Sequence, residues 1–293
     1  MSRSLGMQIA KLFGLASAVA ATDLLLPLYN APGTNGAAWA SVREALVQHP
    51  DVNATIVVNV NNGPGAGPPT ADWIAGGQAL GSLPNVNLIG YVHSSRCQRR
   101  VEEMQAEVTA WANWRPQGVS INGIFIDEAP YNGNCTDYMR DLTAHIREVA
   151  DLDVVVYNPG FPATPLALQP YYDVNPTYVS ALETCFATMT NGNDQCDEPY
   201  TKYDQGGYGT TIDSTLRDWV GVQNYRRTAI LIHGYHDTNG LYTANDETLS
   251  GLLRAVVDRG IGAAVFTTNQ WTTPDAEPAD IGTMVALLSL ANM

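Results

Sequence analysis

The chain has 293 residues, of which 45% are hydrophobic and 15% charged, and this composition favours a globular protein over a disordered chain or a coiled coil. With 29 acidic and 15 basic residues the formal net charge is -14, which disfavours nucleic acid and anionic lipid surfaces as partners. No apolar run reaches the roughly 20 residues that a membrane-spanning helix needs, so we expect no membrane partner.

The first 21 residues have the pattern of a secretory signal peptide. Arg3 and Lys11 precede a short apolar run, and the Ala-Val-Ala at residues 18–20 suits signal peptidase. The alternative is an amphipathic helix that stays in the mature protein. Sequons at Asn53 and Asn134 are compatible with secretion. We expect a signal peptide over residues 1–21, an extracellular location, and one domain over residues 22–293 that acts as a monomer.

Short apolar or β-branched runs recur along the rest of the chain, and most are followed by a polar segment and then by apolar residues at helical spacing. Strands are predicted at Leu24–Tyr29, Thr55–Val60, Asn87–His93, Ile121–Asp127, Asp153–Asn158, Tyr178–Glu183, Thr228–Tyr235 and Ala263–Asn269. Helices are predicted at Trp39–Val47, Arg99–Trp114, Asp137–Ala150, Asp246–Arg259 and Ile281–Leu290. Several strands are apolar on both faces, as parallel strands covered by helices must be. The alternation predicts an α/β protein with a single (β/α)8 TIM barrel.

A doubly wound open sheet is the alternative architecture, and it would normally carry a nucleotide-binding loop. The glycine-rich stretch at residues 61–69 lacks the Gly-Lys-Ser/Thr ending of a phosphate loop and runs into prolines rather than a helix. We interpret it as a tight turn that brings backbone close to the mouth of the barrel.

In a (β/α)8 barrel the working residues stand at the C-terminal ends of the strands. Asp127 and Glu128 end the fourth predicted strand, and Glu183 ends the sixth. We predict that these three acids are catalytic. The other strand ends supply amides, histidines and aromatic rings that we expect to bind substrate: Tyr29, Asn59, Asn61, Tyr91, His93, Asn158, His233, Tyr235, Asn269 and Trp271.

The spacing of the acids fits glycoside hydrolysis. Consecutive strand residues point to opposite faces, so only one of Asp127 and Glu128 is expected to face the mouth. Alternate strands contribute to the same layer, which puts Glu183 at the height of that acid and about 9 to 10 Å along the sheet before side chains lean inward. Glycosidases use two carboxyls about 5 to 9.5 Å apart, one protonated and one ionised. The alternative is structural: Asp127 caps a turn and Glu183 pairs with an arginine.

Other chemistries have less support in the sequence. His233 and His236 lie three apart without an HExxH motif, and no GxSxG elbow is present, so we expect no metal, no cofactor and no serine nucleophile. The four cysteines have no CxxC spacing and fit two disulfides, for which three pairings exist. Strand placement favours Cys97–Cys135, on neighbouring loops, and Cys185–Cys196, within one loop.

Four motifs in the first half of the barrel together resemble the spherulin-4-like family of glycoside hydrolases, family 135. They are Leu-Pro-Leu-Tyr at 26–29, Asn-Val-Asn-Asn-Gly-Pro-Gly at 59–65, Gly-Tyr-Val at 90–92 and Gly-Ile-Phe-Ile-Asp-Glu at 123–128. The resemblance implies a secreted, endo-acting (β/α)8 enzyme that cleaves α-1,4-linked N-acetylgalactosamine in a polysaccharide. It also implies Asp127 as nucleophile or stabiliser and Glu183 as acid/base, with Glu128 tuning or positioning them.

The chain departs from the family pattern at two loops. Val60 and Asn62 replace the family's Pro and Ser, and residues 94–97 (Ser-Ser-Arg-Cys) replace its Thr-x-Tyr-Gly. Both loops flank the expected cleft, so a secreted carbohydrate-binding or coat protein without turnover is the alternative function. The expected partner is a hexosamine-containing polysaccharide, and a partly deacetylated, cationic polymer would be attracted by the net charge of -14. The acidity could equally serve solubility alone.

Overall fold

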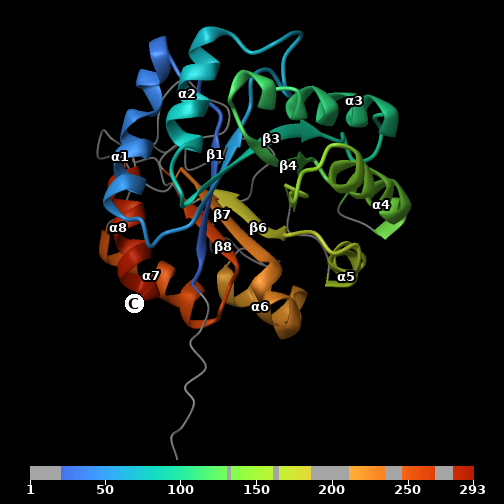
Figure 1. Cartoon of the computed structure of the whole chain (residues 1–293). Coiled ribbons are helices and arrows are strands. Elements are labelled where there is room, and N and C mark those ends of the chain that lie inside the picture. Colours follow the sequence, from blue (N-terminus) through green and yellow to red (C-terminus); the bar gives the residue numbers. More distant parts are fainter. Residues whose placement is uncertain (1–20, 131–132, 161–164, 186–210, 235–245, 268–279) are drawn as a thin grey trace, which may run out of the picture.

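The computed structural model describes residues 21–130, 133–160, 165–185, 211–234, 246–267 and 280–293 (Figure 1). Eight parallel strands pair in sequence order and close into a barrel, and helices surround it (Figure 1). The prediction of a (β/α)8 barrel is therefore confirmed. Residues 1–20 of the expected signal peptide lie outside the described residues, as do Tyr235, His236, Asn269, Trp271 and Cys196.

The strands are β1 (Asp23–Leu28), β2 (Ala54–Val58), β3 (Val86–His93), β4 (Ile121–Asp127), β5 (Val154–Tyr157), β6 (Tyr178–Cys185), β7 (Thr228–His233) and β8 (Ala263–Phe266). The helices are α1 (Ala40–Gln48), α2 (Ala71–Gly81), α3 (Val101–Ala112), α4 (Thr136–Ala144), α5 (Pro165–Asp173), α6 (Ile212–Trp219), α7 (Asp246–Asp258) and α8 (Ile281–Asn292). Short 3-10 or π turns stand before α1, after α3 and α4, and before α4 and β7. In the described part of the chain, no helix has the length and apolar character to cross a membrane.

Burial on both faces explains why these runs form strands of a barrel. Every residue of β2, β6, β7 and β8 is buried, because one face lines the barrel interior and the other packs under helices. Helix and sheet approach closely at Gly90 of β3, where an added Cβ would lie 2.4 Å from the indole of Trp111. The Trp111 indole N–H donates to the Tyr91 carbonyl at 2.8 Å. This contact fixes α3 against the strand that carries Tyr91.

Several predicted boundaries shift by one or two residues. The strands β1, β2 and β5 end at Leu28, Val58 and Tyr157, so the polar or aromatic residues that follow them stand in the loops at the mouth. The helix predicted from Asp137 to Ala150 begins one residue earlier as α4 and ends in a π turn over His145–Val149. Helices α2, α5 and α6 were not among the predicted helices.

Candidate active site

Asp127 is the last residue of β4, and its carboxylate is held by the two neighbouring strands. The hydroxyl of Tyr91, on β3, donates to Asp127 Oδ2 at 2.7 Å. The side-chain amide of Asn158, just past β5, donates to Asp127 Oδ1 at 2.9 Å. Each oxygen of the carboxylate therefore accepts one hydrogen bond from a fixed side chain.

The same amide also reaches the acid on β6. Asn158 Nδ2 donates to Glu183 Oε2 at 2.8 Å, and both residues are almost fully buried, at 2% and 4% exposed. The nearest oxygens of Asp127 and Glu183 therefore lie no more than about 6 Å apart, because each is within hydrogen-bond distance of one nitrogen. The structure thus brings together two of the three predicted catalytic acids.

Glu128 turns away from this pair. Its φ of 47° places it in the left-handed region, and its side chain is 49% exposed. The imidazole of His93 lies beside it, with Nδ1 3.7 Å from Glu128 Oε2. The Glu128 carbonyl accepts from the Arg96 amide at 2.8 Å and from the Ser94 hydroxyl at 2.7 Å. Of the two consecutive acids, only Asp127 joins the network that contains Glu183.

Burial is the main influence on Asp127, and it raises the pKa of this carboxyl above its ordinary value. Hydrogen bonds from Tyr91, from the Glu128 amide and from Asn158 stabilise the ionised form and oppose that shift, while the charge of Glu128 adds to it. The result is a desolvated carboxyl group that retains its proton at higher pH than an exposed aspartic acid does.

The loop after β3 has an unusual backbone conformation. Ser95, Arg96 and Cys97 all have positive φ, at 47°, 55° and 61°. Such φ values are costly for residues other than glycine and persist only where the surroundings hold them. Here the Arg96 amide is bonded to the Glu128 carbonyl, and Cys97 forms a disulfide with Cys135 on the loop after β4.

The Cys97–Cys135 pairing confirms the prediction made from strand placement. Cys185, the last residue of β6, is also disulfide-bonded. Its predicted partner Cys196 lies outside the described residues, so that pairing stays a prediction.

Four more of the predicted substrate-binding residues lie at the end of β7 or in the loops just after β1 and β2. Tyr29 packs edge-on against Tyr91, with ring centroids 5.4 Å apart, so it borders the acids. Asn59 Oδ1 accepts from the Gly63 amide at 3.1 Å and so holds the glycine-rich turn, whereas Asn61 is exposed. His233 is fully buried at the end of β7, opposite Cys185.

Two residues that the sequence did not indicate bond main-chain carbonyls of the site. Ser94 is fully buried and its hydroxyl holds the Glu128 carbonyl. Arg99 donates to the His93 carbonyl at 2.9 Å and makes two hydrogen bonds to the Glu107 carboxylate, at 2.6 and 3.2 Å. No sequence pattern marks either residue, because both act through main-chain groups that only the folded chain brings near.

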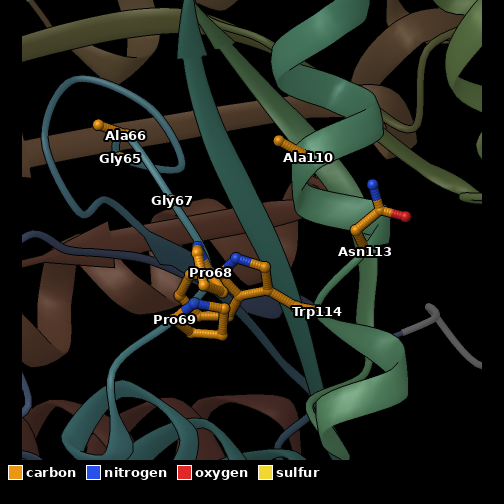
Figure 2. A pocket seen from close by; sticks show the side chains of 8 residues that line it. All are labelled: Gly65, Ala66, Gly67, Pro68, Pro69, Ala110, Asn113 and Trp114. Carbon is orange, nitrogen blue, oxygen red and sulfur yellow. The ribbon is translucent and has the colours of Figure 1, made fainter.

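A pocket of about 370 Å³ lies between the glycine-rich turn after β2 and the C-terminal part of α3 (Figure 2). Its lining consists of Gly65, Ala66, Gly67, Pro68, Pro69, Ala110, Asn113 and Trp114. None of the three acids lines it, so this pocket is separate from the acid pair. Among the described residues, no group of three potential metal ligands occurs.

A family model and a curated relative match this chain. A model of the spherulation-specific family 4 matches residues 23–287. Spherulin-4 of Physarum polycephalum is 31% identical over 137 residues, a match that spans 47% of this chain and only 39% of that relative.

Two solved structures show the shared fold. Aspergillus clavatus Sph3, in complex with GalNAc, is similar with a TM-score of 0.68 and 22% identity, covering 92% of this chain and 98% of that one. A class V chitinase from Nicotiana tobaccum is similar with a TM-score of 0.51 and 9% identity, covering 91% and 99%.

Proposed function

The chain belongs to the spherulation-specific family 4, and on that basis we propose that it is a secreted, endo-acting glycoside hydrolase. Its substrate would be α-1,4-linked N-acetylgalactosamine or galactosamine in an exopolysaccharide or cell-wall polysaccharide. The solved relative Sph3 was crystallised with GalNAc, which supports a hexosamine in the cleft. The disulfide between Cys97 and Cys135 supports an oxidising, extracellular location.

The observation that carries the proposal is the pair of buried acids joined by one amide. Glycoside hydrolysis needs one carboxyl to protonate the leaving oxygen and one to attack or stabilise the anomeric carbon. Asp127 and Glu183 stand at the mouth ends of β4 and β6, close enough for both to reach one glycosidic bond.

The roles that we propose for the two acids rest on the family resemblance and on the hydrogen bonds of Asp127. Asp127 accepts hydrogen bonds at both oxygens, which suits a carboxylate that acts as nucleophile or stabiliser. Glu183 then acts as acid/base. Glu128, exposed and 3.7 Å from His93, would tune the site through its charge and contact substrate at the rim, together with the rings of Tyr29 and Tyr91.

A separation of no more than about 6 Å is nearer to the spacing of retaining enzymes, about 5 to 5.5 Å, than to the 6.5 to 9.5 Å of inverting enzymes. We therefore propose a double displacement. The deciding experiment is incubation with galactosamine-rich exopolysaccharide, followed by chromatography of released oligosaccharides. Product from the wild type and none from Asp127→Asn or Glu183→Gln supports the proposal, and no product from any of them contradicts it.

A second candidate function is carbohydrate binding without turnover. It is favoured by the loop at residues 94–97, where the chain departs from the family pattern and adopts three left-handed residues in a row. This candidate predicts that polysaccharide binds to the wild type and to Asp127→Asn with the same affinity, while neither releases product.

A further inference from the structure

Asn158 makes two hydrogen bonds that join the two acids of the site, and neither its sequence position nor its residue type indicates such a role. We propose that Asn158 is a positioning residue: its single amide group fixes the distance between Asp127 and Glu183 and stabilises whichever of them carries the negative charge. This inference rests on the proposed function, because it assigns both acids to one reaction.

The two bonds use the full donor capacity of the amide. A side-chain amide nitrogen carries two hydrogens, and here one points to Asp127 Oδ1 and the other to Glu183 Oε2. The reverse orientation of the amide would turn Oδ1 toward two carboxylate oxygens, and it would be stable only with both acids protonated. In the observed orientation Oδ1 is buried and has no hydrogen-bond partner among the residues that the structure describes. Both hydrogens thus favour ionised acids.

The backbone of Asn158 is anchored to the strand that carries Asp127. The Asn158 amide donates to the Ile126 carbonyl at 2.9 Å, and the Ala129 amide donates to the Asn158 carbonyl at 2.9 Å. Asp127 lies between those two partners in the sequence. Because β5 stands between β4 and β6 in the barrel, a side chain at the end of β5 is the one that can reach both acids.

Double displacement moves the negative charge from one acid to the other. In the first step an Asp127 oxygen forms a bond to the anomeric carbon, the bond to the leaving oxygen breaks, and Glu183 gives its proton to that oxygen. Asp127 thereby becomes a neutral ester and Glu183 becomes a carboxylate. The Asn158 amide is already bonded to both, so it stabilises the charge before and after the step without moving.

Other charged or titratable groups surround the pair and bear on its titration. Tyr91 on β3 donates to Asp127, and Glu128 follows Asp127 directly. His93 on β3 lies beside Glu128, and Arg96 bonds the carbonyl of Pro159, next to Asn158. On β7, His233 stands two residues beyond Leu231, the register partner of Glu183. Only Asn158, among the described residues, bonds both acids.

The test replaces Asn158 with leucine, which has nearly the same volume and no donor. We expect kcat to fall about 100-fold with KM changed less than about 3-fold, because the loss concerns the reacting groups and not substrate affinity. The acidic limb of the pH profile of kcat/KM should move upward by about one unit. Asn85→Leu is the matched control: Asn85 is a buried amide that binds the carbonyls of Leu46 and Val52 near the opposite end of the barrel. It should lower Tm without moving the pH profile.

A second readout does not depend on turnover. Titration of the Asp127 and Glu183 carboxyl carbons by NMR should give higher pKa values in Asn158→Leu than in the wild type, because a donor to each ionised form has been removed. Coincident titration curves overturn the proposal whether or not the wild type hydrolyses polysaccharide. If the pKa values are higher in Asn158→Leu but the wild type releases no product, the role of Asn158 is supported and the proposed function is contradicted.

If Asn158→Leu does not fold, Asn158→Asp takes its place, since it keeps the shape of the side chain. Its carboxyl donates one hydrogen bond when protonated and none when ionised. We expect kcat to fall further as the pH rises through the pKa of the new carboxyl. A kcat profile with the same shape as that of the wild type overturns the proposal.

Discussion

The hydroxyl of Tyr91 lies 2.7 Å from Oδ2 of Asp127 and reaches it from the neighbouring strand. The Tyr91 ring is held by its own neighbours: it stacks on Phe125, with centroids 6.2 Å apart, and meets the edge of Tyr29. The position of the hydroxyl is therefore set by ring packing, so that removing the oxygen alone should leave the ring in place.

Tyr91→Phe should raise the pKa of Asp127 further, because burial already raises it and the hydroxyl opposes that shift. Under the proposed function, kcat/KM should fall about 10- to 100-fold on the acidic side, the cost of a lost hydrogen bond to a charged group. The acidic limb should move to higher pH. Tyr138→Phe is the control, since Tyr138 is on α4 and its buried hydroxyl has no hydrogen-bond partner in the described part of the chain. An unchanged acidic limb in Tyr91→Phe would contradict the role given to the hydroxyl.

Asp127→Asn and Glu183→Gln should each reduce kcat by about a thousandfold or more, since each removes a reacting group. Chromatography of released sugars measures this. Turnover retained by both variants would exclude the acid pair as the catalytic centre.

The stability of Asp127→Asn should depend on pH differently from that of the wild type. The pKa of Asp127 is raised in the native state, so the native protein holds this proton at pH values where the unfolded chain has released it. The stability from this group is present at low pH and is lost as the pH rises through the native pKa. At neutral pH, Asp127→Asn should therefore melt at the same temperature as the wild type or higher, and this gain should disappear toward acidic pH. A lower Tm at neutral pH would mean that the ionised carboxylate stabilises the fold.

The short separation of Asp127 and Glu183 predicts retention of anomeric configuration. Proton NMR of a reaction with a defined oligosaccharide, recorded before mutarotation, shows which anomer appears first. The α-anomer should appear first from an α-linked substrate. Initial release of the β-anomer would mean that a water molecule fits between the acids, which the bridging amide argues against.

Replacing Cys97 and Cys135 together with serine should destabilise the protein by about 4 kcal/mol, the chain-entropy value for a sequence separation of 38 residues. Denaturant unfolding measures this. Activity should fall at temperatures well below the melt, because the disulfide also holds the left-handed loop whose Arg96 amide bonds the Glu128 carbonyl. Loss of stability with unchanged kcat would limit the disulfide to a structural role.

Raising the salt concentration should increase the apparent KM for a partly deacetylated polymer and leave that for the fully acetylated polymer unchanged. The first is cationic and is drawn to a chain of net charge -14, and salt screens only charged partners. Equal salt responses on the two polymers would leave the acidity without a role in substrate capture.

The order of the hydrophobic runs was enough to predict the barrel. Strands that are apolar on both faces fit few architectures other than a parallel sheet covered by helices. The positions of Asp127 and Glu183 could be predicted for the same reason: each follows an apolar run at its C-terminal end. Helices α5 and α6 were not predicted. A proline at position 170 lies inside α5, and α6 has only eight residues, so neither shows a long run of apolar residues at helical spacing.

The contacts within the site could not be predicted in this way. Substrate binding by Asn158 stays a prediction. Its bonds to both acids depend on the direction of its side chain, which the sequence does not give. The left-handed residues Ser95 to Cys97 give no local signal either, since none is glycine. Their conformation is imposed by the disulfide and by the bond to the Glu128 carbonyl, and these form only in the folded chain.

The pairing of β5 with β6 is narrow, with only Val156–Tyr178 and Tyr157–Val179 in register, whereas β3 and β4 pair over six positions. The hydrogen bond from Asn158 to Glu183 adds one more link between these two strands, at the mouth of the barrel. Narrow seams are where a native protein opens locally without unfolding as a whole. A transient opening here would separate Glu183 from the amide while Asn158 stayed attached to β4. Local opening of β5 from β6 would then separate the two acids, and closing would bring them together again. A sugar bound to both acids would stabilise the closed state.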